Sequence, residues 1–264
     1  MTTTVSRSPV GELLRRWRER RRISQLDLSI EADISTRHLS FVETGRSQPS
    51  RDMVLRLADS LDVPLRERNH LLLAAGYAPV YGEASLSAPQ MAAVRQAIRL
   101  VLKAHEPFPA IVVDRGWNLV DANATIALLT AGAAPQLLEP PVNVLRLTLH
   151  PDGVAPRIVN LGEWRAHLLA RLRREIAVSA DERLVELLDE LRAYPGGKPD
   201  VEVPGSGDVV VPLRIRSDAG ELRLLSTVAT FGTPLDVTVA ELSIESFFPA
   251  NPETAEALNS SAGA

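Results

Sequence analysis

The sequence predicts two domains, an all-α domain over residues 1–80 and an α+β domain over residues 81–264. Three observations support this division. A chain of 264 residues is long enough to bury two separate cores. The segment 76–82 (GYAPVYG) has the glycine and proline content of a domain boundary. Apolar residues recur at helical spacing before this segment, and runs typical of β-strands follow it.

The N-terminal domain is predicted to contain five short helices. The first begins at Pro9 and carries an apolar stripe that includes Leu14 and Trp17. Asp33 stands where a tight turn needs left-handed geometry, and Gly45 ends the third helix. The remaining helices are expected to start after Ser24, Ser35, Ser50 and Pro64. Two short helices joined by a tight turn, inside a five-helix unit, are typical of a helix-turn-helix that binds DNA.

The charge of the chain is divided unevenly between the two domains. Residues 1–78 contain 13 Arg against 10 Asp and Glu, a balance of +3, whereas residues 79–264 contain 16 basic and 23 acidic residues, a balance of −7. Every cation in the first stretch is an arginine, whose guanidinium group can bind a phosphate with two hydrogen bonds. The overall net charge of −4 therefore conceals a basic N-terminal domain.

The second and third helices resemble those of the phage-repressor (XRE-type) helix-turn-helix family. The resemblance rests on Ser24-Gln25 at the start of the second helix, on residues 43–46 (ETGR) and on Pro49-Ser50. The family usually has glycine at the position of Asp33, so this sequence departs modestly from the family pattern there. The resemblance implies a transcription regulator that binds double-stranded DNA, and a two-fold dimer would bind a pseudo-palindromic operator.

The chemistry of these residues indicates particular DNA contacts. Gln25, first in its helix, is expected to anchor a phosphate. Arg37 can donate two hydrogen bonds to a guanine, and Phe41 can contact a thymine methyl group. Arg46 and Arg51 are expected at phosphates. The predicted DNA-binding set is Gln25, Ser35, Thr36, Arg37, His38, Ser40, Phe41, Arg46 and Arg51.

Two residues of this region can have a role other than DNA contact. His38 can contact DNA or can simply be exposed to solvent. Glu43 is expected, by analogy with the family, to pair with Arg18 and to stabilise the fold, because a carboxylate near DNA phosphates would oppose binding.

The C-terminal domain is predicted to combine helices with antiparallel strands. A helix runs from Ser87-Pro89 to His105, and a β-hairpin turns at Arg115-Gly116. A short helix follows Asn123. The other predicted elements are the hairpin strands 110–114 and 117–121, the helices 162–178 and 181–194, and the strands 209–216, 221–231 and 235–247.

Several segments of this domain resemble the ligand-binding domain of MmyB-like transcription regulators. The resemblance covers residues 84–258 and rests on the segments 143–146 (NVLR), 149–153 (LHPDG), 164–168 (WRAHL), 194–195 (YP), 231–236 (FGTPLD) and 245–249 (ESFFP). It implies a PAS-like five-stranded antiparallel sheet flanked by helices, a homodimer, and a hydrophobic pocket able to accept a fatty-acyl chain or fatty acid as effector.

A pocket of this kind is expected between the sheet and its covering helices, with a few polar groups for a ligand headgroup. Ordinary core packing is the alternative for each apolar candidate. A carboxylate could be held by Arg146, His150 or His167, although His150 is equally suited to a turn. The predicted ligand-binding set is Trp117, Leu119, Arg146, Trp164, His167, Leu168, Leu224, Val228 and Phe231.

The composition excludes several other classes of protein. The absence of cysteine rules out disulfides, thiolate zinc sites, iron–sulfur clusters and cysteine nucleophiles. The sequence lacks the Gly-x-Ser-x-Gly, phosphate-loop and His-Glu-x-x-His motifs, so neither an enzyme, a metal site nor a cofactor is expected. The apolar runs are too short to cross a membrane, and no signal segment precedes the first domain, which favours the cytoplasm.

The sequence leaves two aspects of function open. A repressor is favoured over an activator. The C-terminal domain could also serve only to dimerise or to dock a protein partner, without binding a ligand.

Overall fold

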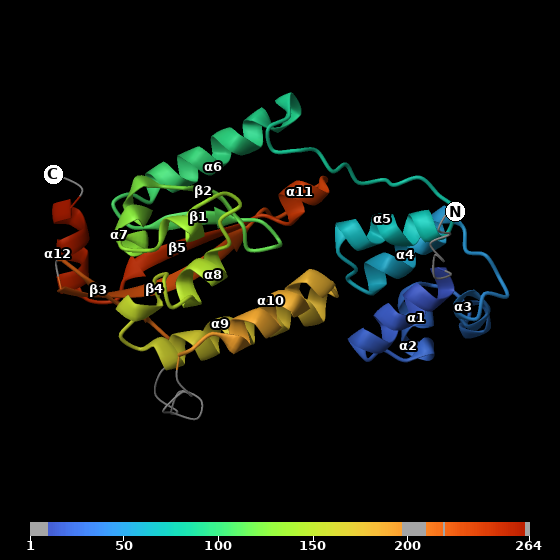
Figure 1. The fold of residues 1–264 in the computed structure, drawn as a ribbon. Coiled ribbons are helices and arrows are strands. Elements are labelled where there is room, and N and C mark those ends of the chain that lie inside the picture. The colour runs from blue at the N-terminus through green and yellow to red at the C-terminus, as the bar shows by residue number, and fades with distance from the viewer. Residues whose placement is uncertain (1–9, 197–209, 219, 262–264) are drawn as a thin grey trace, which may run out of the picture. The chain divides into compact units, whose positions relative to one another are not determined.

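The computed structural model describes residues 10–196, 210–218 and 220–261. They form two compact units, drawn as a ribbon in Figure 1. The first unit extends to Ala84 and also includes Pro234–Ala240; the second comprises Ser85–Thr233 and the residues from Glu241 onward. The helix unit thus contains a short segment from the C-terminal half of the chain.

The five predicted helices of the N-terminal region are confirmed. In chain order they are α1 (Val10–Arg21), α2 (Gln25–Glu31), α3 (Thr36–Glu43), α4 (Arg51–Ser60) and α5 (Leu65–Ala74). The side-chain oxygens of Ser24, Ser35 and Ser50 each accept a hydrogen bond from a backbone N–H in the first turn of the next helix. Asp33 (φ 50°) and Gly45 (φ 72°) adopt the left-handed geometry that the two turns require. Pro9 lies outside the described residues.

The core of the helix unit consists mainly of leucine side chains from all five helices. At Gly11, α1 approaches the backbone of α3 so closely that an added Cβ would lie 2.1 Å from the carbonyl oxygen of Val42. Only glycine fits this position, and the contact fixes α1 against α3. Fully buried core leucines are Leu14, Leu28, Leu39, Leu57, Leu61, Leu71 and Leu72.

The second unit contains a five-stranded antiparallel sheet with the strand order β2-β1-β5-β4-β3. Its strands are β1 (Ala110–Val113), β2 (Leu119–Ala122), β3 (Leu213–Ser217), β4 (Gly220–Thr230) and β5 (Ser243–Pro249). Its α-helices are α6 (Ala92–Ala104), α7 (Ala127–Thr130), α8 (Val144–Leu149), α9 (Leu161–Ser179), α10 (Glu182–Ala193) and α12 (Pro252–Ser261).

Helices cover both faces of this sheet, as Figure 1 shows. Because side chains alternate along a strand, β1 directs Ile111 and Val113 to one face and Ala110 and Val112 to the other. The first face packs against α8, α9 and α10 in the larger core, and the second packs against α6. Among the described residues, no helix is long and apolar enough to span a membrane.

Two parts of the C-terminal prediction were wrong in detail. A strand over 235–247 was expected, but the segment contains a helical turn, α11 (Val237–Ala240), and β5 begins only at Ser243. The Asp236 carboxylate accepts a hydrogen bond from the backbone N–H of Thr238, 2.9 Å away, and thereby caps the turn. Two helices were not predicted, α8, which is capped by Asn143, and the C-terminal α12. Val209, the expected start of a strand, lies outside the described residues.

Candidate functional site

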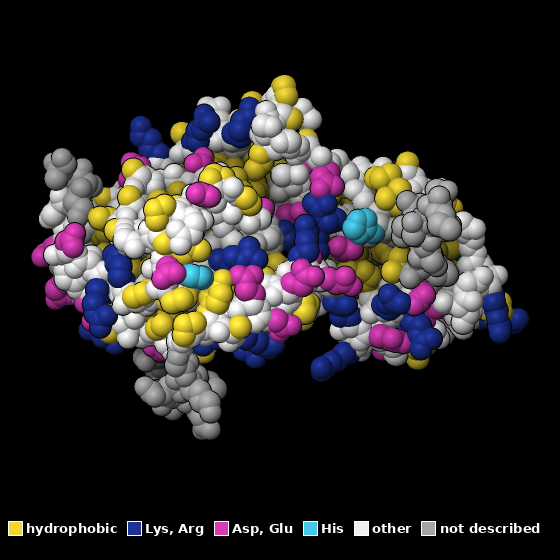
Figure 2. Space-filling view, viewed as in Figure 1, with side chains coloured by type: hydrophobic (Ala, Val, Ile, Leu, Met, Phe, Trp, Pro, Cys, Tyr) yellow, Lys and Arg dark blue, Asp and Glu magenta, His cyan; other side chains and the backbone are white. Residues whose placement is uncertain are grey.

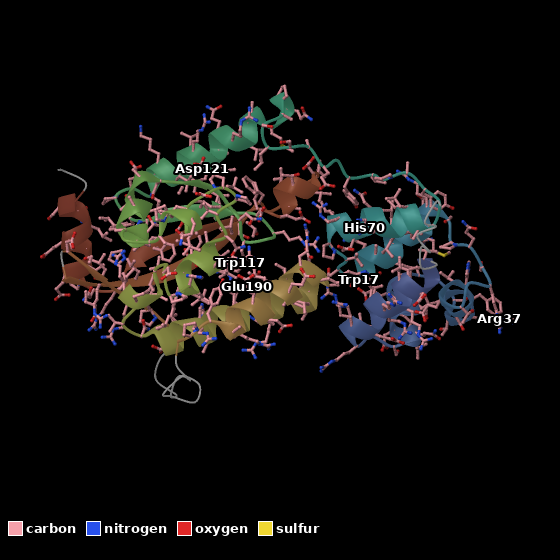
Figure 3. All side chains as sticks on the ribbon, viewed as in Figure 1. Trp17, Arg37, His70, Trp117, Asp121 and Glu190 are labelled. Atoms are coloured by element: carbon pink, nitrogen blue, oxygen red, sulfur yellow. The ribbon has the colours of Figure 1, made fainter. Side chains whose placement is uncertain are left out.

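The outward side of α3 carries the polar residues that sequence reasoning selected. Leu39, Val42 and Glu43 are buried on the inward side. Arg37 is exposed, and Figure 3 shows its side chain directed away from the other helices of the unit. A short helix with an apolar inner face and an exposed arginine in its first turn has the form that enters a major groove.

Two arginines lie against a single aromatic ring on this face. The guanidinium carbon of Arg37 lies 5.4 Å from the centre of the Phe41 ring, and that of Arg46 lies 5.9 Å from it. Both distances are within the range of cation–π attraction. The ring therefore holds two positive groups beside each other, one on the helix and one on the following loop.

The other α3 candidates make local contacts. The Ser35 hydroxyl accepts a hydrogen bond from the N–H of His38, and Thr36 Oγ1 lies 2.8 Å from Ser29 Oγ on α2. His38 Nε2 is 3.5 Å from Ser47 Oγ. Ser40 is half-buried on α3. The Ser35 and Thr36 hydroxyl groups therefore both take part in holding the turn between α2 and α3.

The predicted pair between Arg18 and Glu43 is present. The Glu43 carboxylate accepts hydrogen bonds from Arg18 Nε (2.6 Å) and Nη2 (2.9 Å), and its side chain is only 2% exposed. This hydrogen bond raises the pKa of the Arg18 guanidinium, against the opposing effect of burial. Gln25 Nε2 also donates to Glu43, over 2.7 Å, which sequence reasoning missed. The pair links α1 to α3, and Gln25 joins α2 to it.

The charged surface of the helix unit is mixed rather than uniformly basic. Figure 2 shows dark-blue basic side chains over the region of α1 to α3, with acidic side chains between them. Arg51 is exposed at the first position of α4. Several α1 arginines are engaged with neighbours: Arg15 pairs with Glu19, and Arg21 donates to the carbonyl oxygens of Leu61 and Asp62.

An apolar cavity of about 220 Å³ lies within the second unit. It is bounded by side chains from β1, β2, β3 and β5, from α7, α8 and α9, and from the loops between them. Protein cores seldom contain voids larger than a water molecule, so a cavity of this size is a candidate ligand site. Of the predicted residues, Trp117, Leu119, Trp164 and Leu168 line it.

The other predicted pocket residues do not line this cavity. Leu224 is buried in the same core, whereas Val228 is 45% exposed on β4. Phe231 packs against the core beneath α6, on the opposite face of the sheet. Arg146 forms an ion pair of 2.7 Å with Glu190, which raises the pKa of the arginine. His150 Nδ1 accepts from the N–H of Asp152, consistent with a turn role.

Charged residues that sequence reasoning missed form a network at one side of the cavity. Glu245 lines the cavity from β5 and is 4% exposed. Arg171 on α9 contacts Glu245 (3.1 Å) and Glu175 (3.2 Å), and its guanidinium lies 4.3 Å from the centre of the Trp117 ring. Trp117 Nε1 donates to Glu175 over 2.7 Å. The only signals in the sequence are the i,i+4 spacing of Arg171 and Glu175 and a glutamate within an apolar strand.

Burial shifts the pKa values of two residues near this network. Burial is the main cause of the raised pKa of Glu175. The charge of Arg171 and the hydrogen bond from Trp117 act in the opposite direction and lower this pKa. Burial, followed by the charge of Arg171, lowers the pKa of His167. The His167 ring stacks on Trp164, with ring centres 5.2 Å apart, and the lowered pKa favours its neutral form.

Comparisons with known proteins agree with both parts of this description. Residues 94–260 match the family described as "MmyB-like transcription regulator ligand binding domain", and residues 9–71 match a "Helix-turn-helix domain". No curated protein gives a significant match. One similar solved structure is titled "Structure of an RNA-binding Light-Oxygen-Voltage Receptor"; it has 17% identity and a TM-score of 0.28, over 98% of this chain and 64% of that chain.

Proposed function

Because the chain belongs to the MmyB-like transcription regulators and has an N-terminal helix-turn-helix domain, we propose that it is a repressor controlled by a small hydrophobic ligand. In this proposed role the protein regulates transcription and catalyses no reaction. The observation that carries the proposal is the apolar cavity of about 220 Å³ in the domain of the ligand-binding family. The ligand would change the affinity of the protein for its operator.

On the DNA side, Arg37 is proposed to bind a guanine, with Phe41 against a neighbouring thymine. Gln25, Arg46 and Arg51 would contact phosphates. The hydroxyl and imidazole groups of Ser35, Thr36, His38 and Ser40 would complete the surface. A homodimer would place two α3 helices in successive major grooves, about 34 Å apart, on a pseudo-palindrome.

On the ligand side, Trp117, Leu119, Trp164 and Leu168 are proposed to contact an apolar chain or ring. A fatty-acyl group is one candidate, because the cavity lining is largely aliphatic and aromatic. His167 would act indirectly by supporting the Trp164 ring.

A route from the cavity to the helix unit is proposed through the connection between β4 and β5. Strand β5 contributes Glu245 and Phe247 to the cavity wall. The residues that precede β5 cluster with the helix unit, where Asp236 Oδ2 accepts the N–H of Ala84 (3.1 Å) and Gly82 O accepts the N–H of Val237 (2.7 Å). A displacement of β5 by the ligand would therefore act directly on residues 82–84.

Val80 and Tyr81, which come shortly before this contact, are tied to α5. Buried Asn69 on α5 accepts the N–H groups of Val80 (3.0 Å) and Tyr81 (3.1 Å) through Oδ1, and donates to the carbonyl oxygen of Tyr81 (2.8 Å) through Nδ2. These three hydrogen bonds fix Val80 and Tyr81 to α5, directly before residues 82–84.

The Asp236→Ala variant tests this route. It is expected to retain ligand but to lose the effect of a cell lipid extract on operator binding, which we expect to be roughly fivefold or more in the wild type. Gel-shift titration would measure the effect, and native mass spectrometry would measure ligand retention. Asp189→Ala, at an exposed ion pair with Arg192 on α10, is the matched control and should respond as the wild type does. An Asp236→Ala protein with the full response would rule out this route.

Selection of bound DNA from a random pool tests the function as a whole. The expected result is an enriched pair of half-sites related by two-fold symmetry, with centres one helical turn or a multiple of it apart. A pool that remains random after several rounds would contradict sequence-specific binding.

A further inference from the structure

The wall of the apolar cavity is thinnest at Leu138. This side chain lines the cavity and is also 41% exposed to solvent. At this point a single side chain therefore separates the cavity from solvent. Within the described residues, the other side chains that line the cavity are buried or half-buried. The half-buried ones lie in one stretch of the chain, from β2 to α8; they are Leu119, Ile126, Thr130, Val142 and Thr148.

Leu138 belongs to a loop whose hydrogen bonds to the rest of the domain lie at its two ends. At one end the N–H of Ala134 donates to the carbonyl oxygen of Asp152 (2.8 Å). At the other end the N–H of Leu119 donates to the carbonyl oxygen of Val142 (2.8 Å). Residues 135–141 between these two ties are here called the lid loop. In the described part of the chain, the lid loop forms hydrogen bonds only within itself and with Ala134.

Little buried surface holds the lid loop in place. All of its residues are exposed except Leu137, which is half-buried and packs against the larger core. Three of the seven positions are proline and have no N–H to donate, namely Pro135, Pro140 and Pro141. Segments with few buried contacts and few hydrogen bonds to their surroundings open at a much lower free energy than the whole domain. The lid loop can therefore move while the sheet and α9 stay in place.

We propose that the ligand enters and leaves the cavity at Leu138, and that the lid loop opens to let it pass. This inference rests on the proposed function and adds the route by which the ligand reaches its site. The wall on the side of α9 and β3 is closed, because Trp164, Leu168 and Ile215 are at most 4% exposed. Entry there would require α9 to separate from the sheet. Opening of the lid loop, rather than diffusion, would then limit how fast a ligand exchanges.

A small apolar probe can measure this exchange. Fluorobenzene is close in size to benzene, which fits an apolar cavity of about 150 Å³. The cavity of about 220 Å³ in this protein has room for it. Fluorine-19 exchange spectroscopy on the full-length protein gives the association and dissociation rate constants separately. A lid that acts only on the barrier changes both rate constants by the same factor and leaves the dissociation constant unchanged.

Two variants loosen the lid loop in different ways. Leu138→Ala shortens the side chain that closes the entrance. Leu137→Ala removes the half-buried contact of the loop at a residue that does not line the cavity. Each variant is expected to raise both rate constants roughly tenfold, because opening no longer has to break the contacts of a leucine side chain. The dissociation constant should change by less than about threefold, because the closed cavity stays largely the same.

Leu100→Ala is the matched control. It makes the same substitution at a leucine on α6 that is 62% exposed and does not line the cavity. Both of its rate constants should stay within about twofold of the wild-type values.

The outcomes separate this inference from the proposed function. If fluorobenzene binds but the two lid variants exchange it as the wild type does, the entrance lies elsewhere and the ligand site remains. The same conclusion follows if Leu138→Ala changes only the dissociation constant, or if Leu100→Ala exchanges as fast as the lid variants. If the wild type binds no fluorobenzene up to its solubility limit, the proposed ligand site itself fails. Should Leu137→Ala not fold, Leu138→Ala against Leu100→Ala decides.

Discussion

The Glu43→Gln variant is expected to unfold at least roughly 10 °C below the wild type, in a thermal scan followed by circular dichroism. The substitution preserves the size of the side chain but removes its charge. The Arg18 guanidinium, whose side chain is 11% exposed, would then be buried without a counter-ion. Removing one partner of a buried ion pair costs about 3–5 kcal/mol. A loss of that size is a large fraction of the stability of a small domain.

A matched control separates burial from the simple loss of a carboxylate. Glu19→Gln removes the same charge at an exposed i,i+4 pair with Arg15, where the glutamate is 51% exposed. Exposed pairs of this kind contribute little, so the control should unfold within a few degrees of the wild type. If Glu43→Gln were as stable as the wild type but altered in DNA affinity, the structural role of the pair would be refuted.

The Arg37→Ala variant is expected to lose about 1–3 kcal/mol of operator binding, which is roughly 5- to 150-fold in affinity. Arg37 is exposed on the outward side of α3, and the Phe41 ring beside it limits the positions of its guanidinium group. Removing a guanidinium that binds one guanine also relaxes selectivity at that base pair. Fluorescence anisotropy with operator variants at each position would measure both effects.

Two further variants show whether the effect belongs to base recognition. Arg46→Ala should weaken binding to all sequences alike, because a phosphate contact carries no sequence information. Arg16→Ala removes an arginine that pairs with Glu12 on the exposed side of α1, and it serves as the charge-matched control. If Arg37→Ala bound the operator as the parent protein does, Arg37 would not be the residue through which α3 recognises a base.

The helix-turn-helix could be predicted in detail because its signals are local. Ser24, Ser35 and Ser50 cap the helices that immediately follow them, and Asp33 and Gly45 adopt the turn geometry within the same segment. The pairing of Arg18 with Glu43, by contrast, could be predicted only through the resemblance to a known family. The physical reason is that these two residues are far apart in the sequence and meet only through the packing of α1 on α3.

The cavity could be predicted only in part, because its wall is assembled from distant segments. Trp117 and Trp164 were identified as large apolar residues within recognisable segments. The network of Arg171, Glu175 and Glu245 joins α9 to β5, and no short pattern contains all three. Phe231, the residue after the end of β4, packs against the core on the α6 side of the sheet, and the sequence alone did not define which face it would take.

The helical turn α11 was missed because two signals compete in one short segment. Its apolar residues Val237 and Val239 fit a strand, but the Asp236 cap stabilises a turn. A second contact of Asp236, with the N–H of Ala84, comes from residues very distant in the sequence.

The most direct test of the account is the DNA selection performed with and without a cell lipid extract. The protein alone is expected to enrich a pseudo-palindromic operator, and the extract is expected to reduce this enrichment strongly while leaving the consensus unchanged. Equal enrichment of the same operator under both conditions would contradict control of DNA binding by a hydrophobic ligand.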